Sequence, residues 1–384
     1  MTASSDLRVG ICAIAKDEGS YLEEWIAYHH LQGYNPIRVY AHECTDNSHG
    51  VLTRLAKYGL CEWEPFVSPP KRKPQWMAYQ QGMEVLRPRT DWLAFIDLDE
   101  FVVTPRHPSI QAFLAEHGHL GAIAVNWKMF GSAGRLEREP GFVIERFTRC
   151  APLKARPNRS IKMLARTDTI DIPRVHTAHF VPGTVYQTVL GEPIGDHVGT
   201  SERVSHDLIR VNHYFTRSLE EWERKATRGR GAKRSNSPLK HRTREEFDAQ
   251  DHNEELDTEI LRWVEPMRTL IAELHEIDLD QVHSELDAEQ RRNRRLEADV
   301  TRLGEELRFA ASRSDSLQAA LQAETRRCEA LEQLVGRIAD STSWRVGTRA
   351  VRAARLATLR RGDGPSALDV AARTLRQPER HDAS

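Results

Sequence analysis

The chain has 384 residues, enough for a full domain and a further module, since a single domain commonly takes about 100–200 residues. It carries 55 Lys and Arg residues against 56 Asp and Glu residues, and this formal charge of −1 excludes a global attraction to nucleic acid or to an anionic membrane. The five cysteines are scattered without a CxxC pair, which argues against a disulfide framework or zinc knuckle and favours a reducing cytoplasm. We expect neither a signal peptide nor a membrane-spanning helix, because no leader pattern and no run of about 18 apolar residues occurs.

Short β-rich runs alternate with helical patterns over roughly the first 125 residues, as in a doubly wound α/β sheet. Hydrophobic periodicity predicts the individual helices and strands, and the helix expected at 74–86 begins with a proline at its first position. The expected strands are 8–15, 36–41, 92–96 and 121–130, and the expected helices are 20–33, 50–59, 74–86 and 109–117.

The middle of the chain, from 130 to about 215, reads as a loop-rich half that faces the substrate. The segment 224–246 is strongly basic before Pro238 and has few apolar anchors. We interpret it as a flexible boundary or an active-site flap.

Three carboxylates, Asp97, Asp99 and Glu100, follow the apolar strand at 92–96. In an extended chain residues i and i+2 point the same way, so Asp97 and Asp99 can both reach one ion while Leu98 turns to the core. Clustered carboxylates repel each other, and a hard divalent ion such as Mg²⁺ or Mn²⁺ relieves the repulsion. Because ligands of open α/β sheets bind beyond the carboxyl ends of the strands, the sequence predicts a metal site here.

A heptad repeat runs from Leu279 to Ile338, where fourteen of eighteen a and d positions are apolar. A seam of this length predicts a coiled coil, and Asn293 at an a position favours a parallel dimer; a lone solvated helix would leave the leucines without a partner. Residues 341–361 contain six arginines and no acidic residue. This segment fits either a basic amphipathic helix on an anionic leaflet or a disordered tail.

Five segments occur in the order ICAIAKDEGSYLEEWIAYHHLQGYNPIRVY, TDWLAFIDLDEFVV, AVNWKMFGSAG, VIERFTR and RVNHYFTRSLEEWERKATRGR. Together they resemble the family-2-like and family-92-like glycosyltransferases of the GT-A fold, over about residues 7–230. The resemblance implies a Rossmann-like mixed sheet flanked by helices and a nucleotide-sugar donor across the strand ends. It also implies a Mn²⁺ or Mg²⁺ ion that stabilises the departing nucleoside diphosphate.

Carried over by position, the resemblance makes Asp97 and Asp99 the metal and donor motif. The resemblance implies that His213 is a third metal ligand or a diphosphate contact, and His179 is the other candidate for this position. Alternatively, His213 is a hydrogen-bonded histidine of the core. Ala41 stands where the family often has Asp, so Glu43 is a substitute and the choice among UDP, GDP and dTDP stays open. The residues placed at the donor are Ala13, Ala15, Lys16, Glu18, Glu43, Asp46, Gln75, Tyr79, Asp97, Lys162 and Arg217, and Lys225 and Arg228 are further candidates to neutralise the diphosphate.

An inverting transfer needs a general base within hydrogen-bond reach of the acceptor hydroxyl. Glu145 is the first candidate and Asp171 the alternative. Glu145 can equally form a structural ion pair with Arg146, Arg149 or Arg159.

The predicted organisation is a GT-A domain at 1–235, a helical or flexible linker at 236–275, a coiled coil at 276–340 and a basic tail at 341–384. The expected partners are a nucleotide-sugar donor, a glycan or lipid-linked glycan acceptor, a second copy through the coiled coil, and the inner face of the cell membrane through the tail. No nucleic acid is expected. The expected role is cell-surface polysaccharide synthesis, and the expected location is the cytoplasm. The alternatives are a nucleotidyltransferase, for which the first strand lacks a Gly-rich phosphate loop, and an inactive coiled-coil scaffold.

Overall fold

The computed structural model describes residues 7–69, 72–195, 198–228, 242–311 and 325–333. The chain divides into two compact units, Met1–Ile277 and Asp278–Ser384, and each is described by itself. Among the described residues, no helix combines the length and the apolar composition that crossing a bilayer requires.

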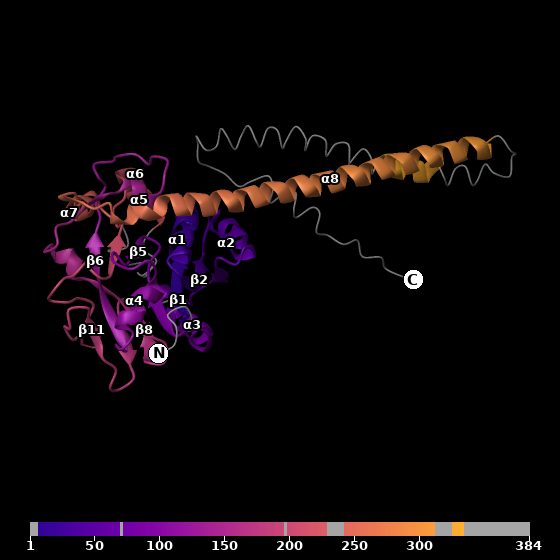
Figure 1. The fold of residues 1–384 in the computed structure, drawn as a ribbon. Helices are drawn as coiled ribbons and strands as arrows, with labels where there is room; N and C mark the ends of the chain where they lie inside the picture. Colours follow the sequence, from indigo (N-terminus) through magenta and orange to yellow (C-terminus); the bar gives the residue numbers. More distant parts are fainter. Residues whose placement is uncertain (1–6, 70–71, 196–197, 229–241, 312–324, 334–384) are drawn as a thin grey trace. The chain divides into compact units, whose positions relative to one another are not determined.

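The first unit is built on a nine-stranded mixed sheet, flanked by helices (Figure 1). The strand order is β3-β2-β1-β4-β8-β6-β12-β5, and β11 pairs with β6. Strands β3, β2, β1 and β4 are parallel, whereas β8 is antiparallel to both of its neighbours, β4 and β6. Strands β6 and β12 therefore run in the direction of β4, and their carboxyl ends reach the same edge of the sheet.

The expected strands and helices of the first 130 residues are confirmed to within three residues at each end. The strands are β1 (Val9–Ala15), β2 (Tyr34–His42), β3 (Glu62–Phe66), β4 (Trp92–Phe95), β5 (Glu100–Val103), β6 (Ala122–Met129), β7 (Arg149–Cys150), β8 (Ile161–Arg166), β9 (Ile170–Pro173), β10 (Ala178–Phe180), β11 (Tyr186–Thr188), β12 (Arg210–His213) and β13 (Glu255–Leu256). The helices are α1 (Gly19–Leu31), α2 (Ser48–Lys57), α3 (Pro74–Leu86), η1 (Arg87–Arg89), α4 (Ile110–His117), α5 (Val143–Arg146), η2 (Arg156–Arg159), α6 (Leu219–Arg228), α7 (Arg244–Gln250), η4 (Glu259–Trp263) and α8 (Val264–Ala311).

Two hydrophobic cores lie on the two faces of the sheet, because successive strand residues point to opposite sides. Ile11 and Ala13 of β1 pack in one core with Trp25 of α1, which is fully buried. Cys12 and Phe95 pack in the other core with Tyr79 of α3. Both faces of β4 are covered in this way, which confirms the central strand predicted at 92–96.

The segment from 130 to 215 contains a central strand where the sequence pattern predicts loops. Strand β8 inserts between β4 and β6, antiparallel to both, and so makes the sheet mixed, as the Rossmann-like mixed sheet expected from the resemblance requires. Its Lys162 is buried at 1% exposure, which breaks the apolar pattern by which a central strand is recognised.

The compact unit continues past the predicted boundary at 235, as far as Ile277. The first turns of α8 belong to it, because Val264, Met267 and Leu274 are buried in the same core as α1. His275 Nε2 also lies 2.9 Å from the Glu23 carboxylate of α1.

The second unit is helical where it is described, from Asp278 to Ala311 in α8 and again over 325–333. This agrees with the helix that the heptad pattern requires. Pairing into a coiled coil stays a prediction, and the basic segment 341–361 lies outside the described residues.

Candidate active site

Polar side chains from the strands β4, β8 and β12 and from helix α6 meet at the carboxyl edge of the sheet. Asp97 and Asp99 follow β4, and the register of β12 against β6 brings His213 to the same edge. Lys162 of β8 and Lys225 of α6 complete the group. We call these residues, together with Glu100, Arg217 and Glu18, the strand-end cluster.

Both carboxylate oxygens of Asp97 are occupied. Oδ1 accepts hydrogen bonds from Gln75 Nε2 at 2.5 Å and from Tyr79 OH at 3.2 Å, and Oδ2 lies 2.9 Å from Lys162 Nζ. Lys162 also lies 3.2 Å from Glu100 Oε2, which in turn accepts the backbone N–H of Asp97. Asp97 is thus held in place by a buried cation and two neutral donors.

Burial and the neighbouring charges shift the pKa values of Glu100 and Lys162. Burial raises the pKa of Glu100 to about 7, against the lowering effect of the Lys162 ammonium. Burial lowers the pKa of Lys162, but the negative charges of Asp97 and Glu100 outweigh it and leave that pKa raised. Lys162 therefore stays charged at neutral pH.

Asp99 lies between a lysine and a histidine. Its Oδ2 accepts a hydrogen bond from Lys225 Nζ at 2.8 Å, and its Oδ1 lies 3.5 Å from His213 Nε2. Burial would raise the pKa of Asp99, yet the charge of Lys225 and the contact with the His213 ring outweigh burial and hold that pKa well below its ordinary value. Asp99 is therefore ionised and faces the end of β12.

Arg217 spans the strand-end cluster from the loop before α6. Its guanidinium is buried, lies 3.6 Å from the ring centroid of Tyr21 and donates to Glu18 Oε2 at 3.4 Å and to the Leu98 carbonyl at 3.4 Å. Its φ of 56° is unusual for a residue other than glycine. The buried contacts hold this conformation in place.

The predicted donor residues near β1 and β2 form a separate group. Ala13 and Ala15 are buried in the core, while Lys16 Nζ donates to the Glu43 carbonyl at 3.3 Å. Asp46 joins the two strand ends, because its carboxylate accepts from Gly19 N at 2.8 Å and from the Ser48 hydroxyl at 2.5 Å.

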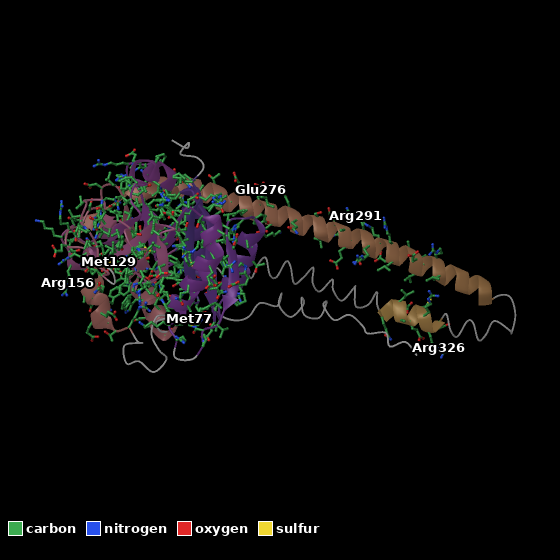
Figure 2. All side chains as sticks on the ribbon, turned by 90° about the horizontal axis from the view of Figure 1, so that it is seen from below. Met77, Met129, Arg156, Glu276, Arg291 and Arg326 are labelled. Atoms are coloured by element: carbon green, nitrogen blue, oxygen red, sulfur yellow. The ribbon has the colours of Figure 1, made fainter. Side chains whose placement is uncertain are left out.

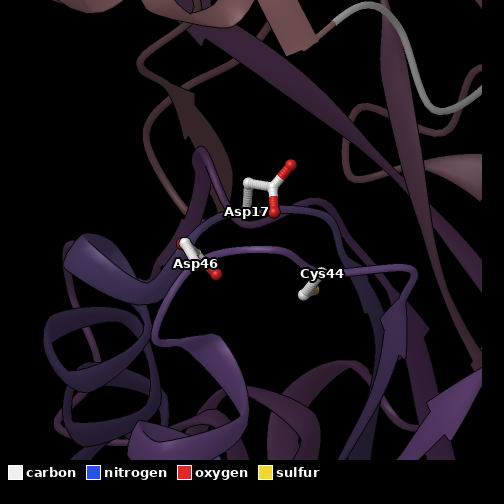
Figure 3. Close-up of side chains that lie close together, drawn as sticks. All are labelled: Asp17, Cys44 and Asp46. Atoms are coloured by element: carbon white, nitrogen blue, oxygen red, sulfur yellow. The ribbon is translucent and has the colours of Figure 1, made fainter. Parts of the chain in front are cut away.

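Among the described residues, the three side chains that best gather ligand atoms for a metal are Asp17, Cys44 and Asp46 (Figure 3). The two carboxylates of this group already accept hydrogen bonds from the loops themselves: Asp17 Oδ1 accepts from Thr45 N at 2.6 Å and from the Thr45 hydroxyl at 3.1 Å. We interpret this trio as a structural tie between the loops after β1 and β2. The set predicted for metal, Asp97, Asp99 and His213, is not gathered as a trio in the described structure; Asp99 and His213 converge, and Asp97 is engaged elsewhere.

We expect Asp46→Ala to lower the free energy of unfolding by about 1–3 kcal/mol, because it leaves the Gly19 amide and the Ser48 hydroxyl without their acceptor. Urea unfolding of the variant and of Asp171→Ala, an exposed residue of β9, measures the difference. Equal midpoints for the two variants would contradict the structural tie.

The two predicted general bases lie in other contacts. Glu145 accepts from Phe142 N at 3.1 Å and lies 2.5 Å from Arg268 Nη2 of α8. This is an ion pair, but its partner is Arg268 of α8 and none of the three nearby arginines that the sequence offered. Asp171 is exposed on β9. His179, the rival to His213, lies on β10 with its Nε2 2.6 Å from Arg174 Nη2. None of these partners belongs to the strand-end cluster.

The comparison with known proteins identifies the family. The model of glycosyltransferase family 92 matches residues 7–257. A family 92 protein from Oryza sativa subsp. japonica is 25% identical over 223 residues, which cover 56% of this chain and 33% of the relative. A family 92 protein from Ricinus communis is 25% identical over 184 residues, covering 46% of this chain and 32% of the relative. The matched region thus spans about a third of each relative's length.

Two solved structures show a limited likeness. S. aureus TarS in complex with UDP-GlcNAc is 17% identical with a TM-score of 0.29, covering 42% of this chain and 46% of that one. Glucosyl-3-phosphoglycerate synthase from Mycobacterium tuberculosis, in complex with Mn²⁺, UDP and its product, is 15% identical with a TM-score of 0.27, covering 44% of this chain and 60% of that one. The family assignment rests on the family model, which covers well over half of the chain. With its segments in the predicted order and its charged side chains collected at one edge of the sheet, the chain belongs to glycosyltransferase family 92.

Proposed function

We propose that the protein transfers a sugar from a nucleotide-sugar donor to a glycan acceptor at the strand-end cluster. Family membership supports the reaction class. The observation that carries the proposal for the site is the position of Asp99 between His213 and Lys225 at the carboxyl edge of the sheet. This edge is where open α/β sheets bind their ligands.

The charge of the strand-end cluster supports a divalent cation as part of the donor site. The negative charges of its carboxylates nearly cancel the positive charges of its lysines and its arginine, so no surplus positive charge remains to bind a diphosphate. The carboxylates are Glu18, Asp97, Asp99 and Glu100, and the cations are Lys162, Arg217 and Lys225.

Asp99 and His213 fit a divalent ion. A separation of 3.5 Å between Oδ1 and Nε2 suits two ligands that each bind one metal at about 2.0–2.2 Å. We propose that these two residues hold Mn²⁺ or Mg²⁺, which when bound stabilises the negative charge of the leaving diphosphate. Asp97 has another role: fixed by Gln75 and Lys162, it orients the donor beside β4.

The chain's own cations complete the binding of the diphosphate. Arg217 is fixed by Tyr21 and Glu18 before any donor arrives, so little freedom is lost when a phosphate oxygen replaces one of its weak contacts. Burial and the charge of Arg217 lower the pKa of Lys225 to about 8 against the effect of Asp99, so its ammonium is charged at pH 7.

The finer parts of the proposal concern stereochemistry and location. We propose inversion at the transferred sugar, an acceptor that is part of a cell-surface polysaccharide, and dimerisation through the heptad repeat. The heptad repeat supports dimerisation, and the basic tail supports a peripheral membrane contact. A nucleotidyltransferase and an inactive scaffold are the alternatives that the experiment separates.

The test is a screen of UDP-, GDP- and dTDP-sugars for donor hydrolysis and for a shift in the thermal unfolding midpoint, each with Mn²⁺ and with a chelator. We expect one nucleotide to give both signals. Mn²⁺ should raise the unfolding midpoint further, and the chelator should remove that gain. A ligand present at 100 times its Kd stabilises the folded chain by about 2.7 kcal/mol, which is enough to shift the midpoint. Release of pyrophosphate from a nucleoside triphosphate would instead favour the nucleotidyltransferase. No response to any nucleotide would favour the scaffold.

A further inference from the structure

A cavity of about 610 Å³ lies beside His213, at the edge of the sheet that carries the strand-end cluster. It is lined by Trp127 and Met129 of β6, Arg156 and Arg159 of η2, and Phe215 after β12. Figure 2 shows Met129 and Arg156 close together at one end of the first unit. The volume falls within the roughly 300–1,000 Å³ that is usual for small-molecule sites.

Two buried polar atoms on the cavity wall have no hydrogen-bond partner in the described part of the chain. They are Trp127 Nε1 and Nδ1 of His213, a residue that is only 5% exposed. The two rings lie 4.3 Å apart between centroids. Because buried polar atoms in native proteins are almost always paired, these two mark a wall of the cavity whose polar groups are not fully satisfied by the described chain.

The charged side chains of the cavity indicate which kind of ligand fits. Arg156 is exposed and makes no hydrogen bond or ion pair within the described residues. Arg159 donates through Nε to the Ser201 carbonyl at 2.8 Å, which leaves its two terminal nitrogens for another acceptor. Glu246 also lines the cavity and has an interaction of its own. Paired guanidinium groups match the planar oxygens of a carboxylate or phosphate.

We propose that this cavity binds the acceptor as an anionic saccharide, whose carboxylate or phosphate group is held by Arg156 and Arg159. A sugar ring packs against the partly exposed rings of Trp127 and Phe215. The inference rests on the proposed sugar transfer. His213 belongs to both the cavity and the strand-end cluster, so an acceptor in the cavity lies beside the donor site.

The test uses the full chain and three forms of one tetrasaccharide: with uronic acid residues, with these carboxyl groups reduced to alcohols, and with a phosphate ester on the reduced form. Calorimetry in the presence of the nucleoside diphosphate measures the Kd of each form. We expect at least one anionic form to bind about tenfold or more tightly than the neutral form, which corresponds to one charge-assisted contact. The two anionic forms distinguish a carboxylate from a phosphate group.

Arg156→Gln and the double variant Arg156→Gln/Arg159→Gln are expected to lose this preference. Arg106→Gln, an exposed arginine after β5 and so near the opposite edge of the sheet, is the matched control and should keep it. The inference is overturned by a neutral form that binds as tightly as the anionic forms, by a preference that survives in the double variant with an unchanged unfolding midpoint, or by absence of binding. Donor hydrolysis in the unmodified chain is measured in parallel, and its absence would overturn the proposed function instead.

Discussion

Asp99→Asn is expected to lower sugar transfer at least about a hundredfold, a loss typical of removing one preorganised electrostatic group from an active site. The substitution removes the charge that faces His213 and that holds Lys225 at 2.8 Å. It therefore weakens the proposed cation site and displaces a cation of the diphosphate site. Initial rates at saturating donor, together with Mn²⁺ binding followed by electron paramagnetic resonance, measure the two effects.

Asp168→Asn is the matched control for this variant, because Asp168 makes an exposed ion pair with Arg166. Its rate should stay within a factor of two of the unmodified chain, since exposed pairs contribute little. An Asp99→Asn protein that is folded and transfers sugar at more than half the original rate would show that the reaction does not use this carboxylate.

A large loss of stability is expected when the buried ion pair that holds α6, the helix that carries Lys225, is broken. Glu221 of α6 forms a two-point ion pair with Arg146 of α5, at 2.8 and 3.0 Å, and also accepts from Tyr21 OH at 2.8 Å. The two charged side chains are 0% and 4% exposed. Glu221→Gln leaves the Arg146 charge buried without its partner, so we expect a loss of about 3–5 kcal/mol in the free energy of unfolding. Urea unfolding measures it, with Glu223→Gln, exposed on the same helix, as the matched control.

The same ion pair predicts a pH dependence. Burial opposes ionisation of Glu221, but the Arg146 guanidinium outweighs burial and lowers the pKa of Glu221 to about 2. Because this pKa is lower in the folded chain than in the unfolded chain, the contribution to stability is full above about pH 4.5 and is lost as the pH falls toward 2. The difference in stability between the unmodified chain and Glu221→Gln should therefore narrow over this range. A difference that stays constant from pH 7 to pH 3 would show that the charge of Glu221 is not its source.

The edge that carries the strand-end cluster was predictable from local pattern. Short apolar runs end at Ala15, His42 and Phe95, and parallel strands bring their carboxyl ends to one edge, so the sequence alone assigns Asp97 and Asp99 to that edge. The five segments and their order predicted the family, and the family model confirms it. His213 was placed at this edge by resemblance alone, since an isolated histidine at the end of a four-residue strand has no signal of its own.

The partners of these residues could not be predicted from local pattern. Lys162 lies 65 residues from Asp97 along the chain, and Lys225 lies 126 residues from Asp99. The buried Lys162 also interrupts the apolar pattern by which its strand, β8, would be recognised. The cavity is assembled from β6, η2 and α7, which are adjacent only in the folded chain. The start of α8 reads as part of a linker because its buried positions face a core formed by residues more than 200 positions away.

We expect the nucleotide-sugar donor to bind at the strand-end cluster. A crystal structure of the full chain with Mn²⁺ and the nucleoside diphosphate that stabilises it most tests this directly. We predict density for the diphosphate within contact of Arg217 and Lys225, and a metal ion bound by Asp99 and His213. A nucleotide bound elsewhere, with Asp99 still paired to Lys225 and no metal beside it, would contradict the claim.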